Sequence, residues 1–301
     1  MLAVAVITGS ATEPVSGQGR QGLLSLDDAR LFYEVVGNGD PVIVIHGGPG
    51  MDHHYLRPGL DALAARHTLI YYDQRGTGRS TAELNANAIS LDAFVDDIDA
   101  LRQVLGYGSV TLLGHSFGAL LAIQYAARFP ESTRALVLMN PVEPGSRFAE
   151  ITAERQRART MSEDAVEMER LRASEGFAAR DPETLGRIYR LAFRSVMRDP
   201  DRVEELSLEL APSTARNGQD VAALLGSSMQ PLDGWDRLAS IETPVLVLQG
   251  RYDAPPPEMG RALAAAFPSG TYQLLDGGHF PFVEDRGGML AAVGGFMAGL
   301  R

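Results

Sequence analysis

The sequence predicts an α/β protein in which a mostly parallel central sheet carries helices on both faces. Short apolar runs, typical of strands buried on both faces, alternate with longer stretches whose apolar residues recur at helical spacing. Between residues 143 and 235 no such strand run occurs, and charged amphipathic stretches take its place. We therefore expect a core domain formed by residues 1–142 and 236–301, with residues 143–235 inserted as a helical cap.

The first half of the chain supplies a hairpin and then alternating strands and helices. Residues 12–22 are rich in Gly, Ser, Gln and Thr, and we expect a mobile lead-in there. Apolar residues alternate on both sides of Asp27 and Asp28, which predicts a hairpin at an edge of the sheet. The elements expected in this half are hairpin strands 23–26 and 30–36, strands 41–45 and 68–72, and helices 56–66 and 91–105.

The stretch around Ser116 combines a strand, a sharp turn and a helix. The apolar run 109–113 leads into Gly114-His115-Ser116-Phe117-Gly118, and residues 119–127 suit a helix lying on a sheet. An apex residue in a strained conformation brings the chain segments beside Gly114 and Gly118 too close together for side chains. The start of the helix also offers the backbone N–H of Phe117 to a developing oxyanion. The pattern predicts a nucleophilic serine at the apex.

The second half contains the cap and the end of the sheet. Arg and Glu residues recur in the cap at three- and four-residue spacing, and we interpret most of them as solvated helix faces. The elements expected in this half are strand 134–139, helical stretches 151–172, 183–197 and 201–210, strand 244–248, helix 257–267, strand 271–275 and helix 285–300.

Composition excludes several classes of chemistry. The chain has 301 residues, of which 45% are hydrophobic and 22% charged, as is ordinary for a soluble globular protein. A net charge of −11 argues against a nucleic-acid partner. Without cysteine there is no disulfide, thiol nucleophile or cysteine-ligated zinc. All 27 basic residues are arginine, which excludes a phosphate-binding P-loop lysine and a Schiff-base cofactor, so no cofactor is expected.

The N-terminus opens with a brief apolar stretch over residues 1–11. No basic residue precedes this stretch, so it is a poor match to a secretory signal, and the cytoplasm is the expected location. A trimmed signal remnant and a first edge strand are the alternatives. No apolar run approaches the length of a membrane span, and no membrane partner is expected. The sequence leaves the oligomeric state open.

A serine hydroxyl attacks a carbonyl well only when a base takes its proton and an acid orients that base. Of the six histidines, only His279 follows Ser116, in a glycine loop after the last predicted strand. Asp253 follows strand 244–248 and is the favoured acid, with Glu258 and Asp276 as weaker competitors. The order Ser, Asp, His is the one found when the serine sits on a strand–turn–helix elbow. We predict Ser116, Asp253 and His279 as the catalytic residues.

The loop after strand 41–45 is expected to supply a second oxyanion donor. It reads His46-Gly47-Gly48-Pro49-Gly50, and bare glycine backbone can approach a ligand closely. Its glycines and Pro49, with Gly114 and Gly118 of the elbow, support the site by shaping the backbone.

The remaining histidines are interpreted as residues without a catalytic role. His115 is expected to be buried beside the elbow, whereas His53, His54 and His67 are interpreted as loop or surface residues. No carboxylate cluster of ligand spacing accompanies His53 and His54 in the sequence, so no metal site is predicted. The adjacent acids Asp96 and Asp97 are assigned, in the same way, to packing and solvent.

Five segments together resemble the proline iminopeptidase-like family of α/β-hydrolases. They are HGGPG at 46–50, DQRGTGRS at 73–80, GHSFGA at 114–119, the aspartate at 253 and GGH at 277–279. The resemblance covers roughly residues 25–300. It implies a Ser-His-Asp triad, a helical cap after the sixth strand, and an oxyanion hole formed by Gly48 and Phe117.

Two departures from that family concern substrate choice. Iminopeptidases usually have glycine before the serine and tryptophan after it, where this chain has His115 and Phe117. Their cap also carries a Trp-rich segment with a glutamate that holds the free amine of the substrate. The only tryptophan here is Trp235, and no cap glutamate can be nominated for that role.

The expected function is hydrolysis of small carboxylic esters, with amides as a further class, through an acyl-enzyme. The first alternative is a proline iminopeptidase that releases N-terminal residues from short peptides. The second is an inactive hydrolase fold that serves as a binding module, which is disfavoured because nucleophile, base, acid and oxyanion glycines are all present. Haloalkane dehalogenases and epoxide hydrolases are excluded because they need an aspartate where Ser116 stands.

Overall fold

The computed structural model describes residues 19–229 and 234–300 of the chain. Its centre is a nine-stranded sheet in the order β1-β2-β4-β3-β6-β7-β8-β9, with β5 paired to β2. The strands are β1 (Arg20–Ser25), β2 (Ala29–Val36), β3 (Asp40–Ile45), β4 (His67–Tyr72), β5 (Thr81–Ala82), β6 (Val110–His115), β7 (Thr133–Met139), β8 (Val245–Gly250) and β9 (Gly270–Leu275). The β1, β4 and β5 pairings with β2 are antiparallel and the others are parallel, which confirms the predicted fold class.

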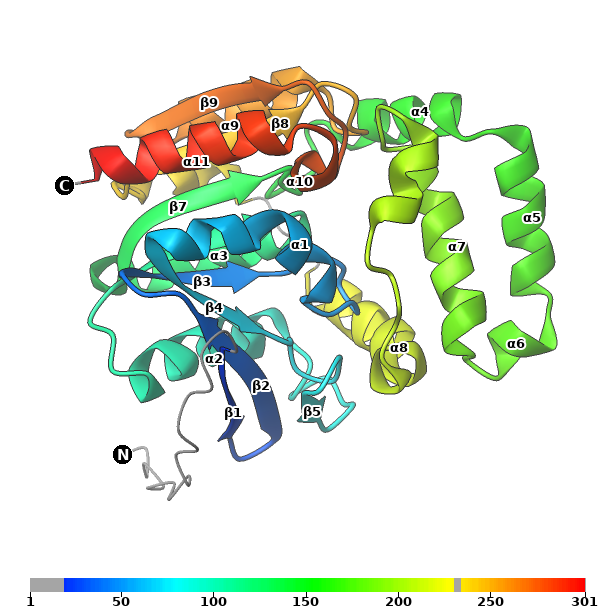
Figure 1. Ribbon diagram of the computed structural model, residues 1–301, viewed down its shortest axis with the longest axis horizontal. Helices are drawn as coiled ribbons and strands as arrows, with labels where there is room; N and C mark the ends of the chain where they lie inside the picture. Colours follow the sequence, from blue (N-terminus) through cyan, green and yellow to red (C-terminus); the bar gives the residue numbers. More distant parts are fainter. Residues whose placement is uncertain (1–18, 230–233, 301) are drawn as a thin grey trace.

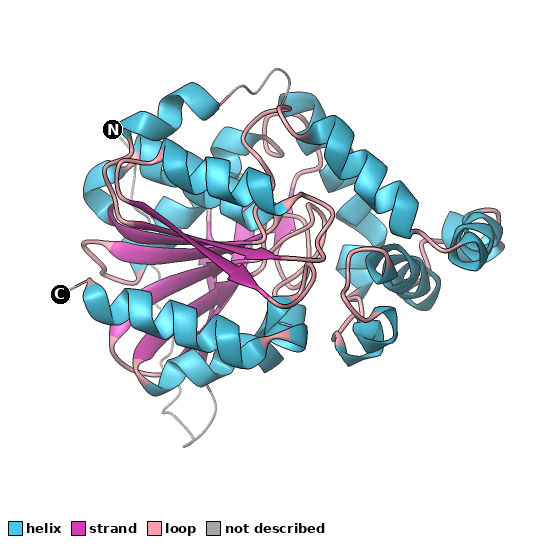
Figure 2. Cartoon of the chain, turned by 90° about the horizontal axis from the view of Figure 1, so that it is seen from above, coloured by secondary structure: helices cyan, strands magenta, loops and turns pink. Residues whose placement is uncertain are grey.

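Helices cover both faces of this sheet (Figure 2). They are α1 (Arg57–Leu60), α2 (Leu91–Val104), α3 (Phe117–Arg128), α9 (Pro257–Ala266), α10 (Pro281–Glu284) and α11 (Arg286–Gly299), with short 3-10 turns η1 (His54–Leu56), η2 (Asp61–Ala65) and η3 (Pro130–Ser132). Alternate residues of a strand point to opposite faces, so Ile43 and Ile45 join the core with α2, α3 and α9, whereas Val42 and Val44 join the core with α1 and α11. This two-sided burial explains the continuous apolar runs.

Two expectations near the N-terminus need correction. Residues 20–22 belong to β1 rather than to a lead-in, while residues 1–18 lie outside the described part of the chain. The helix predicted over 56–66 is instead η1, α1 and η2 in succession. Pro58 lies in the first turn of α1, where proline is tolerated, so it does not cause this difference. The helix instead tightens into a 3-10 turn from Asp61 onward.

The chain between β7 and β8 is helical. Its elements are α4 (Ala149–Arg159), α5 (Ser162–Arg172), α6 (Glu175–Ala178), α7 (Pro182–Arg194), η4 (Pro200–Glu205), α8 (Pro212–Ser228) and η5 (Trp235–Ser240). The last turn, η5, packs back against α3 and α9 in the core. The part from α4 to α8 lies beyond the carboxyl ends of the strands (Figure 1). Leu171, Leu185, Ile188 and Ala215 give it a small core of its own. The helix expected over 201–210 is only the turn η4, and α8 had not been singled out from the sequence.

Among the described residues, no helix has both the length and the apolar character needed to cross a membrane.

Candidate active site

Ser116 sits at the turn between β6 and α3 in a strained conformation. Its φ of 55° and ψ of −119° are rare for a residue with a side chain. A Cβ atom on Gly114 would lie 2.4 Å from the carbonyl oxygen of Gly118, and one on Gly118 would lie 2.2 Å from that of Ile45. The backbone therefore requires glycine at both positions, as the sequence pattern indicated.

Asp253 and His279 meet on neighbouring loops after β8 and β9. The Nδ1 atom of His279 lies 3.0 and 2.9 Å from Oδ1 and Oδ2 of Asp253. The Asp253 side chain is fully buried, and its Oδ1 also accepts a 2.7 Å hydrogen bond from the amide of Ala254. Its Oδ2 accepts from Asn140 at 2.7 Å and from Gln249 at 3.3 Å. The carboxylate is thus held on both oxygens while it orients the imidazole.

The two competing acids, Glu258 and Asp276, lie at the surface beside arginines. Glu258 is exposed and lies 3.6 Å from Arg261, and Asp276 is exposed and pairs with Arg198. Of the three candidate acids, only Asp253 contacts His279.

Asn140 occupies the end of β7, where some hydrolases carry the acid, and its role was not predicted. Its amide donates to Oδ2 of Asp253 and also, at 3.0 Å, to the carbonyl of Gly278 beside the histidine. It therefore links the loops that carry the acid and the base.

The glycine loop after β3 is anchored by the buried side chain of His46. The Nε2 atom of His46 accepts from the amide of Gln74 at 3.0 Å, so the proton is on Nδ1, which donates at 2.8 Å to the carbonyl of Gly47. In a trans peptide the C=O and N–H point in opposite directions, so this bond also sets the direction of the Gly48 N–H. Within the described residues, the amides of Gly48 and Phe117 donate to no protein acceptor.

The same loop packs tightly against its surroundings. A Cβ on Gly47 would lie 3.0 Å from that of Ser116, and one on Gly50 would lie 2.2 Å from the carbonyl oxygen of Gly218 in α8. Gly48 and Gly50 have φ values of 127° and 90°, which favour glycine. Glycine is needed here for close approach to the elbow and to the helical insertion.

His53 and Asp97 correct two sequence assignments. His53 is fully buried rather than at the surface, and its Nδ1 lies 2.6 Å from Oδ1 of Asp73. Asp97 is also buried and forms a two-pronged ion pair with Arg75, with N–O distances of 2.8 and 2.5 Å. The first contact joins the loop before η1 to the DQRGTGRS segment, and the second joins helix α2 to it. Sequence spacing alone does not reveal either contact.

The ligand atoms of His53, His54 and Asp73 lie within 4.8 Å of one another, so a carboxylate does accompany the histidine pair. The two imidazole rings are stacked, with centroids 4.5 Å apart, an arrangement in which their in-plane lone pairs do not converge on one ion. The hydrogen bonds of His53 and His54 to Asp73 and Asp52 account for the cluster without a metal.

Hydrolysis is expected to be unchanged by chelation. The mechanism expected from the sequence, with Ser116, His279 and Asp253 as nucleophile, base and acid, needs no metal, so dialysis against EDTA should leave the initial rate of ester hydrolysis within experimental error. A loss that Zn²⁺ or Mn²⁺ restores would contradict this mechanism.

Asp52 links the same region to α8. It accepts from Thr214 at 3.0 Å, and Thr214 in turn accepts from the amide of Gly78 at 2.8 Å. Burial would raise the pKa of Asp52, but the hydrogen bond from His54, the charges of His46 and His54, and the bond from Thr214 bring it to about 2. The same hydrogen bond raises the pKa of His54.

Replacing Asp52 by Asn should destabilise the protein in a defined pH window. The Asp52 contribution is complete above about pH 4 and is lost as pH falls towards 2, whereas the His54 contribution is complete below about pH 6.5 and is lost as pH rises further. Because His54 is half-exposed, we expect a loss of about 0.5–1 kcal/mol in the free energy of unfolding. Urea denaturation should give the largest difference at pH 5, and smaller ones at pH 3 and 8.

A matched control is Asp96→Asn, which breaks an exposed ion pair with Arg128 and should cost less than about 0.5 kcal/mol. An Asp52→Asn effect that does not vary with pH would contradict the electrostatic origin.

Two arginines of α4 hold the segments that carry the candidate acid Asp253 and the candidate base His279. Arg155 donates at 3.0 Å to the carbonyls of both Asp253 and Ala254. Arg159 donates to the carbonyls of Ser195 and Met197, and between them Val196 accepts a 2.8 Å bond from the amide of His279. Arg155 and Arg159 are thus exceptions to the interpretation of most cap arginines as solvated helix faces.

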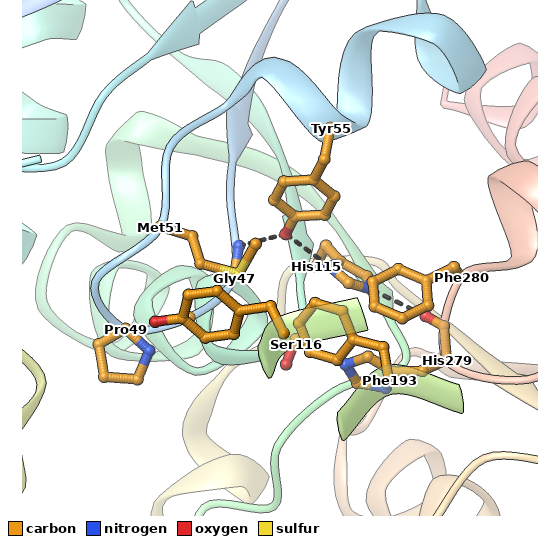
Figure 3. Close-up of a pocket in the computed structure, with 11 residues that line it drawn as sticks. Gly47, Pro49, Met51, Tyr55, His115, Ser116, Phe193, His279 and Phe280 are labelled. Atoms are coloured by element: carbon orange, nitrogen blue, oxygen red, sulfur yellow. Dashed lines mark hydrogen bonds between the residues drawn. The ribbon is translucent and has the colours of Figure 1, made fainter. Parts of the chain in front are cut away.

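A cavity of about 110 Å³ lies between the elbow at Ser116, the glycine loop after β3 and the segment around His279 (Figure 3). Ser116 and His279 both line it, and its other walls come from the glycine loop, β6, α7 and the segment after β9. The remaining lining residues are Gly47, Gly48, Pro49, Met51, Tyr55, His115, Tyr189, Phe193 and Phe280. None of the described residues in this lining carries a carboxylate.

The parallel sheet and its strand–helix elbow define a hydrolase of the α/β type. The family described as alpha/beta hydrolase fold matches residues 40–286, and the chain belongs to it.

The chain is also similar to proteins of two specificities. It is 27% identical to a proline iminopeptidase of Heyndrickxia coagulans over 92% of this chain and 98% of the relative. Among solved structures it is similar to a thermophilic esterase from Thermogutta terrifontis, with a TM-score of 0.70 and 25% identity over 93% of this chain and 99% of that one. A proline iminopeptidase from Mycobacterium smegmatis has the same fold, with a TM-score of 0.69 and 23% identity over 93% and 98% of the two chains.

Proposed function

We propose that the protein is a serine hydrolase that cleaves small carboxylic esters through an acyl-enzyme. Ser116 is the nucleophile, His279 the general base and Asp253 the acid that orients it. The observation that carries this proposal is the pair of contacts, 3.0 and 2.9 Å, between His279 and Asp253 beside the cavity that Ser116 also lines. A base held by a buried acid next to a serine is the requirement for an activated hydroxyl.

In this mechanism His279 carries one proton through each half-reaction. With Nδ1–H donated to Asp253, Nε2 is free to take the proton of Ser116 Oγ as that oxygen attacks the ester carbonyl. The imidazolium then gives the proton to the departing alkoxide, leaving an acyl-serine. Water then attacks the acyl-serine in the same way. Its proton passes to His279 and then to Ser116 Oγ as the carboxylic acid leaves.

The tetrahedral oxyanion is stabilised by the amides of Gly48 and Phe117. Both belong to segments held by close backbone packing, and such preorganised donors stabilise developing charge without rearrangement. We further propose that residues 143–235 act as the cap domain over this site, because Tyr189 and Phe193 of α7 form part of the cavity lining.

The lining favours an ester over an N-terminal peptide substrate. An iminopeptidase must pair the charged amine of its substrate with a buried carboxylate, and among the residues that the structure describes no acidic one lines this cavity. The glutamates of residues 143–235 are all absent from the lining of this cavity. The second candidate function remains proline iminopeptidase activity, which is favoured by the similarity over nearly the whole chain to a protein of that name.

A fluorophosphonate probe tests the serine mechanism directly. The wild-type protein should be labelled once, at Ser116, and Ser116→Ala should not be labelled. A folded wild-type protein that is not labelled would instead support the binding-module alternative.

A further inference from the structure

One hydrogen-bonded chain of side chains joins the three parts of the proposed site (Figure 3). The amide of Gly47 donates to the hydroxyl of Tyr55 at 2.7 Å, and that hydroxyl lies 2.8 Å from Nδ1 of His115. The Nε2 atom of His115 lies 2.8 Å from the carbonyl oxygen of His279. Tyr55 and His115 are both buried, with 3% and 1% of their surface exposed.

The partners at the two ends fix the direction of every bond in this chain. The carbonyl of His279 can only accept, so Nε2 of His115 carries a proton and donates it. Burial, followed by the nearby charge of His279, keeps the pKa of His115 well below its usual range, so the ring is neutral and its Nδ1 is an acceptor. The hydroxyl of Tyr55 therefore donates to Nδ1 of His115 while it accepts from the amide of Gly47.

Each contact of this chain is adjacent to a group with a proposed catalytic role. Gly47 precedes Gly48, the proposed oxyanion donor, and His115 precedes the nucleophile Ser116. The third contact is to the backbone of the base itself. Because aligned hydrogen bonds strengthen one another in a buried site, a break at one point should loosen the geometry of all three groups.

We propose that Tyr55 and His115 are positioning residues that hold the oxyanion loop, the nucleophile elbow and the catalytic histidine in one reactive arrangement. This inference rests on the proposed serine-hydrolase function. The two residues act through the backbone, so their polar groups should influence turnover more than substrate binding.

Tyr55→Phe is the first test. The ring contacts with Phe280 and Phe282 remain, but the amide of Gly47 and Nδ1 of His115 each lose their partner. We expect kcat for p-nitrophenyl acetate to fall about tenfold to hundredfold, with KM changed less than about threefold. The rate of fluorophosphonate labelling should fall in parallel.

Tyr125→Phe is the matched control. It also removes a hydrogen-bonded hydroxyl from a fully buried tyrosine, but that hydroxyl contacts Asp99 and Arg102 rather than the site. This variant should keep wild-type kcat even if its melting temperature falls.

Two replacements of His115 separate polarity from packing. His115→Gln can still place an amide N–H towards the carbonyl of His279, whereas His115→Leu keeps similar bulk without any donor. We expect Gln to retain clearly more kcat than Leu. In a double-mutant cycle, Tyr55→Phe combined with His115→Leu should lose about as much as the worse single variant, because both interrupt one chain.

The wild-type protein gives a test that does not depend on the folding of any variant. ¹⁵N NMR of the histidine rings at pH 7 should find His115 neutral with the proton on Nε2. A proton on Nδ1 would overturn the inference, and so would a Tyr55→Phe variant with wild-type kcat and labelling rate, or multiplicative losses in the cycle. If Ser116→Ala retains activity, the proposed function itself fails, whereas an inactive Ser116→Ala beside a fully active Tyr55→Phe refutes only the positioning role.

Discussion

Ser116→Ala and His279→Ala should each lower kcat by about 10³-fold or more while the protein remains folded. The first removes the atom that forms the acyl-enzyme, and the second removes the base that takes its proton. The residues act as one unit, so the double variant should be little worse than either single one. Ester hydrolysis gives the rates, and circular dichroism with thermal melting checks the fold.

Asp253→Asn should also lose orders of magnitude, and it should additionally lose stability. One carboxylate oxygen now accepts from Asn140 and Gln249, and the other accepts from the amide of Ala254. Whichever oxygen becomes an NH₂ group, a donor will face a donor in a fully buried place, at a cost of about 1–3 kcal/mol. Ser116→Ala creates no such conflict and should melt close to the wild type.

The exposed acids supply the controls for this series. Glu258→Gln and Asp276→Asn should keep wild-type kcat, because neither side chain reaches His279 and both are paired with surface arginines. A fully active Asp253→Asn would show that the acid is misassigned, and an inactive Glu258→Gln or Asp276→Asn would point to the replacement.

The sequence predicted those parts of the fold whose physical cause is local. Strand β3 is buried on both faces, so nearly every residue in it is apolar, and the glycines of the elbow are required by the backbone itself. The helix predicted over 56–66 is a short α-helix followed by a 3-10 turn, a change that the apolar spacing does not reveal.

Residues with long-range partners could not be predicted in the same way. Asn140 directly follows strand β7, but nothing nearby in the sequence indicates that Asp253 and Gly278 are its partners. His53 looked like a loop residue because Asp73, which accounts for its burial, lies beyond the next strand. Tyr55 carried no local signal at all.

Substrate choice should separate the two candidate specificities most sharply. We expect p-nitrophenyl acetate and butyrate to turn over much faster than prolyl p-nitroanilide, and N-acetylation of the prolyl substrate to have little effect. A buried carboxylate that pairs with a substrate amine is worth about 1.5–3 kcal/mol, or roughly ten- to hundredfold in rate. In the described ranges, 19–229 and 234–300, no residue of the cavity lining has a carboxylate to supply that energy. The expected result requires only that an alkoxide or phenoxide departs more easily than an amine.

The size of the cavity adds a limit on the acyl group. A dry cavity of about 150 Å³ lined by apolar side chains accommodates benzene, so the cavity of about 110 Å³ here should hold an acyl group of only a few carbons. Octanoyl esters should therefore be poor substrates, and Phe193→Ala, which removes one aromatic wall, should improve them relative to acetyl esters. The side chain of Phe193 takes no part in the hydrogen bonds that hold Asp253 or in the close packing of Gly114 and Gly118. Its replacement should therefore change the preference for acyl-chain length more than the turnover of acetyl esters. If instead prolyl p-nitroanilide is the best substrate and its N-acetyl form is inert, an amine-binding acid must reach the site, and the iminopeptidase alternative replaces the esterase.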